Sequence, residues 1–447
     1  MNARTKIVPL IVLAAVACGK PKKSTSDGAI NGNGTGVTTT PTYYKDVKPL
    51  IDAKCALCHT TGGIAPFTLQ NFADVSAHAS VIKPAVQNRV MPPWLAGPGC
   101  SDYKGDRSLT ELEIATLASW VDAGAPAGDA THPGAALGAS APGLSRADLR
   151  IAMTAAYTPQ TRPDEYRCFV LDWPATATKF VTGFRVNPGT ASIVHHVIAF
   201  VGGPSSAAEY QSRDHADGRP GYACFGSPGS QPNWIGSWAP GGTGFDFPAG
   251  TGIKVEPGSK IIVQVHYNTL NIDPAPDLTS LDLKLDDSVA KEAVALFWAD
   301  PDWVGNKTMS IPSGDADVVH SFSIDPTPYM GYLTQGVVPT GSDFTIYLST
   351  LHMHTRGSRA RLEIERAAGS NECVLEIPHW DFHWQSGYEF ETPKIFHPGD
   401  KLKLECHWDN SAGHQPIVNG KPLTPPDLNW GENTTDEMCL GVMYVTK

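Results

Sequence analysis

Two histidines, His352 and His354, stand at the end of an alternating run that begins at Asp343 and is rich in Phe, Ile, Tyr and Leu. Such a run predicts a β-strand. Because side chains two residues apart on a strand share a face, the two imidazoles would lie side by side and could bind a transition metal. Two polar residues on the solvent side of a strand would give the same pattern, so other candidate ligands must decide between these interpretations.

Two consecutive histidines, His195 and His196, interrupt the apolar run 193–200. Adjacent residues of a strand point to opposite faces, so both can bind one metal only at a twist, a bulge or a strand end. Burying two consecutive imidazoles without a function is costly. A third candidate, His266, lies near the end of another alternating run, and a methionine, Met438, follows much later in the sequence.

The segment Cys55-Ala-Leu-Cys58-His59 has the C-x-x-C-H spacing of a c-type haem attachment site. Two thioethers would tether the porphyrin, and His59 would supply an imidazole to the iron. We expect Met91, held in a loop by two following prolines, to be the sixth ligand; His78 is the alternative. Met/His ligation would favour electron transfer over oxygen binding. A redox-active cysteine pair with an unrelated histidine is the competing interpretation.

Helical patterns flank this motif. One predicted helix leads directly into Cys55, and its apolar face carries Val47, Leu50 and Ile51. A capping box from Ser108 to Glu111 predicts the start of another helix, with core positions at Ile114, Leu117, Ala118 and Val121. A small all-α domain is therefore expected over residues 42–130, and it resembles the class I cytochrome c fold.

The remainder of the chain has the pattern of an all-β protein. Residues 131–146, rich in Ala, Gly, Pro and Ser, predict a linker. Beyond them, short alternating runs are separated by turns of Pro-Gly type, which is typical of β-sandwiches. Roughly 300 residues are enough for two such domains. We place them at 147–290 and 291–447, so the expected protein is multidomain.

Charge and the first residues restrict location and partners. The net charge of -11 argues against nucleic acid and anionic lipid as partners. Residues 1–18 resemble a bacterial lipoprotein signal, in which Cys18 would be lipidated. Ala15 replaces the usual leucine, so ordinary secretion is the alternative. We expect an exported protein, in the periplasm or at the outer membrane or cell surface, anchored only through lipid by the disordered tether 19–41.

Together the candidate ligands resemble those of the copper type II, ascorbate-dependent monooxygenases, the family of peptidylglycine alpha-hydroxylating and dopamine beta-monooxygenase. The local sequences Val-His-His, Gln-Val-His-Tyr and Asp-Glu-Met-Cys agree with that family. The resemblance covers about residues 160–447 and implies two jelly-roll-like sandwiches, each with one copper ion. It implies one copper bound by His195, His196 and His266, and another bound by His352, His354 and Met438.

The resemblance also implies a reaction, the hydroxylation of a C–H bond of a small organic substrate with O₂. The His/His/Met copper would be the oxygen site, because a thioether favours Cu(I), and the three-His copper would deliver the second electron. Electrons would come from ascorbate or another one-electron donor, such as a donor protein, relayed or replaced by the haem. Thr350, Leu440 and Val442 stand where the peptide-amidating relative has Arg, Asn and Tyr, so we expect a less polar substrate than a peptide.

Six cysteines remain after Cys18 and the haem pair, and an exported location favours disulfides among them. Six cysteines permit 15 pairings. Cys406–Cys439 matches a disulfide of the family beside the methionine ligand. Cys168–Cys224 is our second choice, and the partners of Cys100 and Cys373 are left open.

The other histidines, His383 among them, are expected to be structural, and the run 379–385 to form sandwich core and the wall of a substrate cleft. Two non-enzymatic functions compete with the monooxygenase. The sandwiches could store or sense copper while the haem shuttles electrons to a partner. Alternatively, the chain could be a plain electron-transfer lipoprotein whose β domains only dock a partner; the clustered histidines argue against this last interpretation.

Overall fold

The structure, a computed structural model, describes residues 40–447 except positions 62, 64, 138–142, 225, 226, 231, 241, 270, 271, 419, 420 and 432–434. The expected signal 1–18 with Cys18, and nearly all of the expected tether 19–41, lie outside the described residues. Residues 40–447 form one compact unit. None of its described helices is long and apolar enough to cross a membrane.

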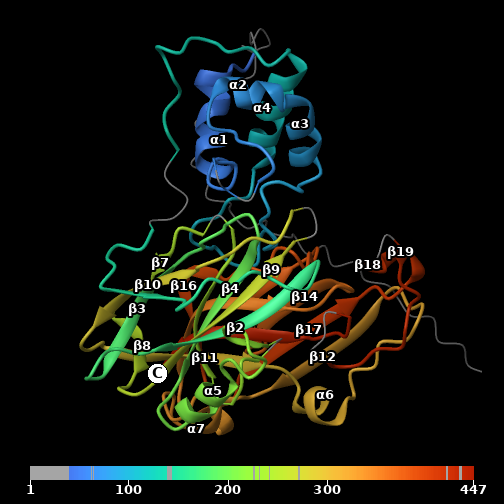
Figure 1. The fold of residues 1–447 in the computed structure, drawn as a ribbon. Coiled ribbons are helices and arrows are strands. Elements are labelled where there is room, and N and C mark those ends of the chain that lie inside the picture. Colours follow the sequence, from blue (N-terminus) through green and yellow to red (C-terminus); the bar gives the residue numbers. More distant parts are fainter. Residues whose placement is uncertain are drawn as a thin grey trace, which may run out of the picture. The chain divides into compact units, whose positions relative to one another are not determined.

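Short helices around the C-x-x-C-H motif form a small bundle (Figure 1). They are a π-helical turn, Tyr43–Val47, followed by α1 (Lys48–Lys54), α2 (Phe72–Ala77), α3 (Ala79–Gln87) and α4 (Glu111–Asp122). Their apolar faces share one core that includes Val47, Ile51, Ile82 and Leu117. Cys55 caps the C-terminus of α1, so this helix fixes where the motif begins.

The capping box of α4 lies two residues after the predicted one. Thr110, not Ser108, caps the helix: its hydroxyl accepts a bond from the Glu113 amide, and the Glu113 carboxylate accepts one from the Thr110 amide. Lys54 forms an ion pair with the same carboxylate at 3.1 Å. This contact with the helix before the C-x-x-C-H motif favours Glu113 over Glu111 as the capping residue.

The rest of the described chain is mostly β-sheet, with two β domains. In the first domain a five-stranded sheet has the order β5-β2-β9-β4-β6. Its strands are β2 (Asp164–Asp172), β4 (Val194–Gly202), β5 (Tyr222–Ala223), β6 (Pro232–Trp238) and β9 (Lys260–Asn268). It packs on strands of a larger sheet through a core that includes Phe184, Val265 and Leu283.

The larger sheet passes through both β domains. Its order is β1-β10-β3-β8-β11-β20-β13-β16, with β7 beside β3. The strands are β1 (Leu149–Ala152), β3 (Lys179–Asn187), β7 (Phe245–Asp246), β8 (Thr251–Val255), β10 (Ser280–Asp286), β11 (Lys291–Trp298), β13 (Phe344–His352), β16 (Tyr388–Phe396) and β20 (Leu440–Thr446). The parallel pairing of β8 with β11, at Thr251–Lys291 and Gly252–Glu292, joins the two halves.

A four-stranded sheet completes the second β domain in the order β12-β17-β14-β15. Its strands are β12 (Val318–Ile324), β14 (Gly357–Glu365), β15 (Asn371–Ile377) and β17 (Lys401–Trp408). The core between it and the larger sheet includes Leu296, Phe344 and Leu404. Smaller elements are α5 (Ala207–Arg213), α6 (Pro301–Asn306), α7 (Met330–Leu333), two 3-10 turns (Thr327–Tyr329 and Ala412–His414) and the hairpin of β18 (Ile417–Val418) and β19 (Lys421–Pro422).

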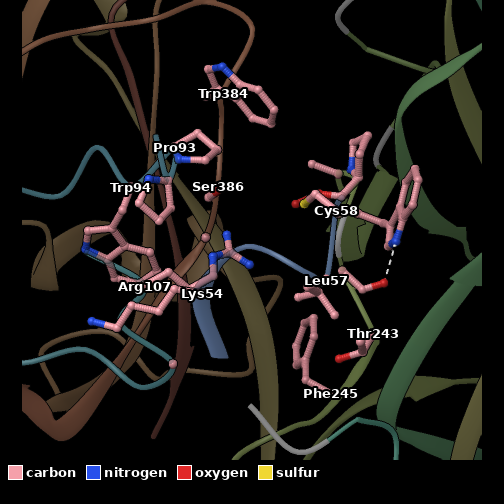
Figure 2. Close-up of a pocket in the computed structure, with 18 of the residues that line it drawn as sticks. Lys54, Leu57, Cys58, Pro93, Trp94, Arg107, Thr243, Phe245, Trp384 and Ser386 are labelled. Atoms are coloured by element: carbon pink, nitrogen blue, oxygen red, sulfur yellow. Dashed lines mark hydrogen bonds between the residues drawn. The ribbon is translucent and has the colours of Figure 1, made fainter. Parts of the chain in front are cut away.

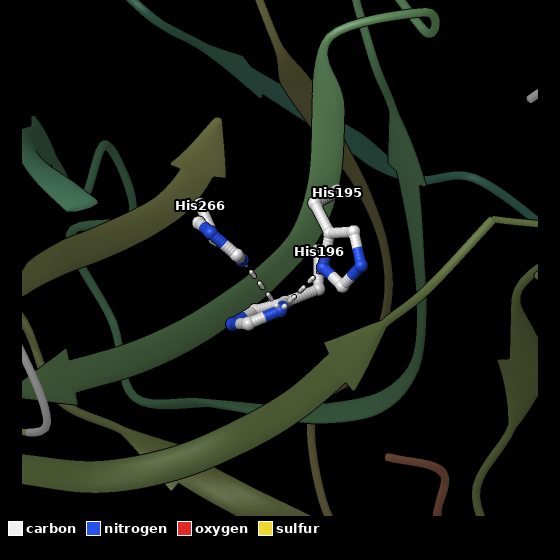
Figure 3. A group of neighbouring side chains, drawn as sticks. All are labelled: His195, His196 and His266. Carbon is white, nitrogen blue, oxygen red and sulfur yellow. Dashed lines mark hydrogen bonds between the residues drawn. The ribbon is translucent and has the colours of Figure 1, made fainter. Parts of the chain in front are cut away.

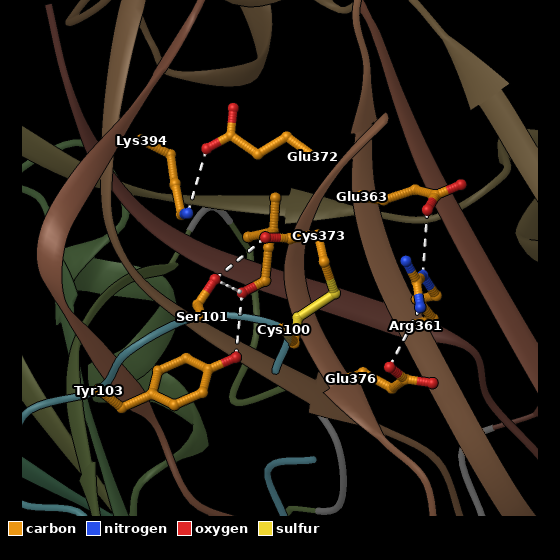
Figure 4. Close-up of a disulfide and its surroundings, with 10 residues drawn as sticks. Cys100, Ser101, Tyr103, Arg361, Glu363, Glu372, Cys373, Glu376 and Lys394 are labelled. Carbon is orange, nitrogen blue, oxygen red and sulfur yellow. Dashed lines mark hydrogen bonds and ion pairs between the residues drawn. A yellow bond between two sulfur atoms is a disulfide. The ribbon is translucent and has the colours of Figure 1, made fainter. Parts of the chain in front are cut away.

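The segment 97–104, between α3 and α4, is attached to the second β domain. The Gly97 amide donates to the Glu376 carbonyl at 2.8 Å, and the Lys104 amide donates to the Glu389 carbonyl at 2.8 Å. A disulfide joins Cys100 to Cys373 (Figure 4). We call these contacts the clamp, because they hold the helical bundle to β15 and β16 by covalent and backbone bonds.

A buried carboxylate ties the first strands of the larger sheet together. Asp282 of β10 is 1% exposed and accepts bonds from Arg150 at 2.7 Å, from Arg185 and from Asn187 at 3.0 Å. The bonds from Arg150 and then Arg185 hold the pKa of Asp282 well below its usual range, although burial works in the opposite direction. Because the pKa of Asp282 is lower in the folded protein than in the unfolded chain, its carboxylate stabilises the fold at pH values above about 4, the unfolded-state pKa. This stabilisation is lost as the pH falls toward the folded-state pKa.

Asp282→Asn is therefore expected to destabilise the copper-free protein by about 2 kcal/mol at pH 7. The difference should shrink as the pH falls below about 4, where the carboxylate of the unfolded chain becomes protonated while the native carboxylate stays ionised. Urea denaturation at pH 7 and pH 3 checks this. Asp287→Asn is the control, because its ion pair with Lys179 is exposed and should contribute about 0.5 kcal/mol or less. Equal effects of the two substitutions would contradict the prediction.

Candidate metal centres

A β-bulge places the consecutive histidines together. β4 pairs with β9 residue by residue from His196–His266 onward, but the register shifts between Val194 and His196. His195 is therefore the extra residue of the bulge, and its side chain turns toward the same side as that of His196. The sequence-based expectation of a bulge is confirmed. His266, the cross-strand partner of His196, completes the group.

The three imidazoles converge through their Nδ1 atoms (Figure 3). Nδ1 of His196 lies 3.3 Å from Nδ1 of His195 and 3.3 Å from Nδ1 of His266. One nitrogen from each ring lies within 4.8 Å of the others, a spacing at which one metal ion could be held. Burial, followed by the neighbouring imidazoles, lowers the pKa of His195 to about 3 and that of His196 well below its ordinary value. Both rings are therefore neutral at neutral pH, the form that binds a metal.

Asp164 orients the third imidazole. Its carboxylate lies 2.8 Å from Nε2 of His266 and also accepts a bond from Asn268 at 2.8 Å. The Nε2–H of His266 thus donates a hydrogen bond to Asp164, and its Nδ1 points at the other two histidines. Tyr166 stacks on the same imidazole, with ring centroids 4.1 Å apart and an interplanar angle of 5°.

Removing this carboxylate should weaken copper binding at the three-histidine group. In Asp164→Ala the His266 ring loses its orienting acceptor, so we expect the copper affinity of that site to fall about 10- to 100-fold. Competition with a chelator of known affinity measures this. Asp172→Ala, at the far end of the same strand and paired with Lys260, is the matched control. An unchanged affinity in Asp164→Ala would contradict the role assigned to the carboxylate.

The second predicted set lies where β13 and β20 end. The antiparallel register pairs His352 with Leu440, and continuing it by two residues brings His354 opposite Met438. Nδ1 of His352 bonds to the amide oxygen of Gln385, and Nδ1 of His354 lies 3.1 Å from the Asp436 carbonyl oxygen. The two ring centroids are 5.1 Å apart. His354 and Met438 are both buried.

Glu437 holds the backbone around this second set. Its carboxylate accepts bonds from the amides of His354 at 3.0 Å and Arg356 at 2.7 Å, and from the Trp408 indole at 2.9 Å. Burial raises the pKa of Glu437 to about 7, although these bonds work in the opposite direction. The next residue along the chain is Met438, so the buried carboxylate links the methionine to the strand that carries the histidines.

The residues of the predicted haem site line a cavity of about 1220 Å³, in which Figure 2 labels Cys58. Cys55, Cys58, His59 and Met91 all contribute to its lining. Nδ1 of His59 bonds to the Phe67 carbonyl at 3.0 Å. The ring of His78, the alternative to Met91, stacks on Phe67, and its Nδ1 lies 2.8 Å from the Asp74 carbonyl.

Residues of the β domains line this cavity as well. They include His195 of the three-histidine group and Gln385, the partner of His352. Thr350 and Val442, which are paired across β13 and β20, line it too. The cavity therefore borders the C-x-x-C-H motif, one residue of the first metal set and the hydrogen-bond partner of a residue of the second. Its volume exceeds the roughly 300–1,000 Å³ that is usual for one small ligand.

The loop 378–387, which connects β15 to β16, lies beside both metal sets. The sequence predicted its run 379–385 as sandwich core and the wall of a substrate cleft; the run forms a loop, and Trp384 and Gln385 line the cavity. The Phe382 ring lies 6.1 Å from the His354 ring, and the His383 ring lies 5.7 Å from the His195 ring. The expectation that His383 is structural missed its proximity to His195. Tertiary packing between residues 188 positions apart brings them together, and sequence spacing gives no signal for that.

Three disulfides are present among the described cysteines. Cys406–Cys439 joins β17 to the residue after Met438, Cys168–Cys224 joins β2 to the segment after β5, and Cys100–Cys373 belongs to the clamp. Disulfides are typical of proteins that fold outside the cytoplasm.

Two family models match the β domains. Residues 149–273 match "Copper type II ascorbate-dependent monooxygenase, N-terminal domain", and residues 332–446 match the C-terminal domain of the same family. The two matches cover 125 and 115 of the 447 residues, more than half of the chain. The chain belongs to the copper type II ascorbate-dependent monooxygenases. The three-histidine group lies in the first matched region, and His352, His354 and Met438 lie in the second.

Two vertebrate relatives are also similar to this copper type II monooxygenase. DBH-like monooxygenase protein 2 of Mus musculus is 25% identical over 291 residues, which are 62% of this chain and 42% of the relative. DBH-like monooxygenase protein 1 of Gallus gallus is 23% identical over 218 residues, 46% of this chain and 32% of the relative. The matched region thus spans less than half the length of either relative.

Proposed function

We propose that this copper monooxygenase is an exported enzyme that hydroxylates a C–H bond of a small, weakly polar molecule with O₂. His195, His196 and His266 would hold one copper ion, and His352, His354 and Met438 the other. Copper at these positions would supply one-electron redox chemistry and activation of O₂. The observation that carries the proposal is that His195, of the three-histidine group, and Gln385, the partner of His352, line one cavity together with the C-x-x-C-H motif.

The donor sets suit different tasks. Three neutral imidazoles bind copper in both oxidation states, whereas a thioether is soft and favours Cu(I), the state that reacts with O₂. We therefore assign the reaction with O₂ to the methionine set and electron delivery to the three-histidine set. Gln385 and the Asp436 carbonyl fix the His352 and His354 rings through Nδ1, so each ring would present Nε2 to the metal.

The lining of the cavity supports a substrate with little charge. Near the second metal set it is formed by Leu348, Thr350, Val442 and Met443. The Thr350 hydroxyl donates to the Ser386 carbonyl at 3.3 Å, so the polar group of this side chain is used within the protein. Apolar walls exclude water and hold an apolar substrate by contact area, which fits C–H hydroxylation of a molecule without a carboxylate.

A c-type haem would act as the electron relay. Cys55 and Cys58 would form the thioethers, and His59 and Met91 would bind the iron. Burial raises the pKa of Cys55 to about 12, so this thiol is not a reactive thiolate at neutral pH. That state argues against a redox-active cysteine pair and favours a cofactor attachment site. The haem would replace or relay ascorbate, or an electron-donor protein. A lipid on Cys18 would tether the exported chain to the membrane.

Metal content tests the proposal. We expect the full haem-loaded chain to contain two copper ions and one iron, and the haem to be covalently bound. In Met438→Leu the side-chain volume is kept but the sulfur is lost, so Cu(I) at the methionine set should bind about 10- to 100-fold more weakly. Inductively coupled plasma mass spectrometry gives the stoichiometry, and X-ray absorption at the copper edge detects the sulfur ligand.

Met353→Leu is the control for this experiment. Met353 lies between His352 and His354 in the sequence and is fully buried in the core, so the same chemical change there should leave both copper ions bound. One iron and no tightly bound copper in the wild-type chain would overturn the proposal. Two bound copper ions without hydroxylation of any molecule in a broad substrate screen would favour copper storage instead.

A further inference from the structure

The loop between β15 and β16 is anchored firmly against the methionine metal set. The Trp380 indole donates to the His354 carbonyl at 3.0 Å, and the Trp380 amide donates to the Ser358 carbonyl at 2.8 Å. Further along, the Gln385 amide group donates to the Phe382 carbonyl at 2.9 Å, and its oxygen contacts His352. The backbone on both sides of His383 is thus fixed by the second β domain.

From this position His383 reaches the metal set of the first β domain. Its ring centroid is 5.7 Å from that of His195, with an interplanar angle of 76°. The rings of His195 and His196, both in the three-histidine group, are 5.6 Å apart at 66°. The His383 ring thus lies beside His195, at the edge of the three-histidine group, whose ring nitrogens lie within 4.8 Å of one another. It lines the cavity and is exposed, so a rotation of this side chain toward the group is not blocked by burial.

We infer that His383 is a fourth imidazole ligand of the copper held by His195, His196 and His266, supplied by the other β domain. This rests on the proposed function for the metal itself. Cu(II) prefers four nitrogen or oxygen ligands in a tetragonal arrangement, and the three-histidine group provides only three. A fourth ligand on the loop that also touches His354 and His352 makes the first metal site span both β domains.

The imidazole number at this copper tests the inference. In the full chain with His352→Ala and His354→Ala, a single Cu(II) remains at the three-histidine group. Electron spin echo modulation and X-ray absorption should count four imidazoles there, and three after His383→Ala. The Cu(II) affinity should fall about 10- to 100-fold in His383→Ala, and the Cu(I) affinity should change less.

His379→Ala is the matched control, because it removes an exposed histidine from the same loop and should leave four imidazoles. If the doubly substituted background does not fold, the chain with both copper ions serves instead. There the average should fall from about three to about two and a half imidazoles per copper with His383→Ala. Three imidazoles before and after the substitution, with copper bound and hydroxylation intact, would overturn the inference alone. No copper at the three-histidine group would overturn it together with the proposed function.

Discussion

His196→Ala is expected to reduce the bound copper from two ions to one and to slow substrate-dependent oxygen uptake by at least ~100-fold. His196 stands at the centre of the first metal set, because its Nδ1 lies 3.3 Å from the Nδ1 atoms of both His195 and His266. Without it, the rings of His195 and His266 remain 4.7 Å apart, but the metal loses the donor that lies beside both of them. The methionine set should keep its copper, since none of its three ligands is changed.

Copper content by mass spectrometry and oxygen uptake with ascorbate as donor measure the two effects. His320→Ala is the matched control. That imidazole lies on β12, and its Nε2 is 2.8 Å from the Ser310 carbonyl, so its removal should leave both copper ions in place. A His196→Ala chain that still binds two copper ions and consumes oxygen at the wild-type rate would refute the assignment of His196.

Removing the Cys100–Cys373 disulfide is expected to have the largest effect on the attachment of the helical bundle. The bond closes a loop with a sequence separation of 273, for which the chain-entropy estimate is about 5–6 kcal/mol. In Cys100→Ser with Cys373→Ser, the segment loses its covalent link and keeps hydrogen bonds such as Gly97–Glu376 at 2.8 Å, Glu391–Asp102 at 2.9 Å and Tyr103–Val374 at 3.1 Å. Local opening should then become at least ~100-fold more frequent.

Hydrogen exchange of the peptides that cover 94–107 and 388–391 measures this opening. We also expect slower haem-to-copper electron transfer in the same variant, with copper and iron content unchanged, because the haem motif would no longer be held beside the cavity. Cys168→Ser with Cys224→Ser is the control: it lowers the stability of the first β domain but should leave exchange in the clamp unchanged. Unaltered exchange in the clamp variant would show that the backbone contacts suffice.

The sequence predicted best those features that depend on the spacing of neighbouring residues. The pair His195–His196 on one strand required a bulge, and the register shift before His196 provides it. Alternation predicted the strand that ends at His352. The C-x-x-C-H motif likewise begins where a helix ends, as the apolar spacing before Cys55 indicated. In each case the relevant physics acts over fewer than about ten residues.

Contacts between residues far apart in the sequence could not be predicted from it. Cys100 could not be matched to Cys373, because the choice among pairings depends on the docking of a loop onto β15. Asp164 and Gln385 could not be identified as partners of ligand histidines, because their positions follow from strand register and loop path. His383 was misjudged for the same reason. The capping box of α4 differs from the predicted one because Lys54, far away in the sequence, forms an ion pair with Glu113 and not with Glu111.

The shared sheet makes the two family domains poor candidates for separate study or exchange. The first family match ends at residue 273 and the second begins at 332, but β10 and β11 lie between them and belong to the larger sheet. Cutting the chain there would expose unpaired strand edges at β8 and β11, which promote aggregation. A chimaera that joins either β domain to the other domain of a different protein would therefore fail to fold unless it also kept the paired strands β8 and β11. The distance between the two metal sets accordingly depends on how the five-stranded sheet, which carries the first set, packs on the larger sheet, which carries the second.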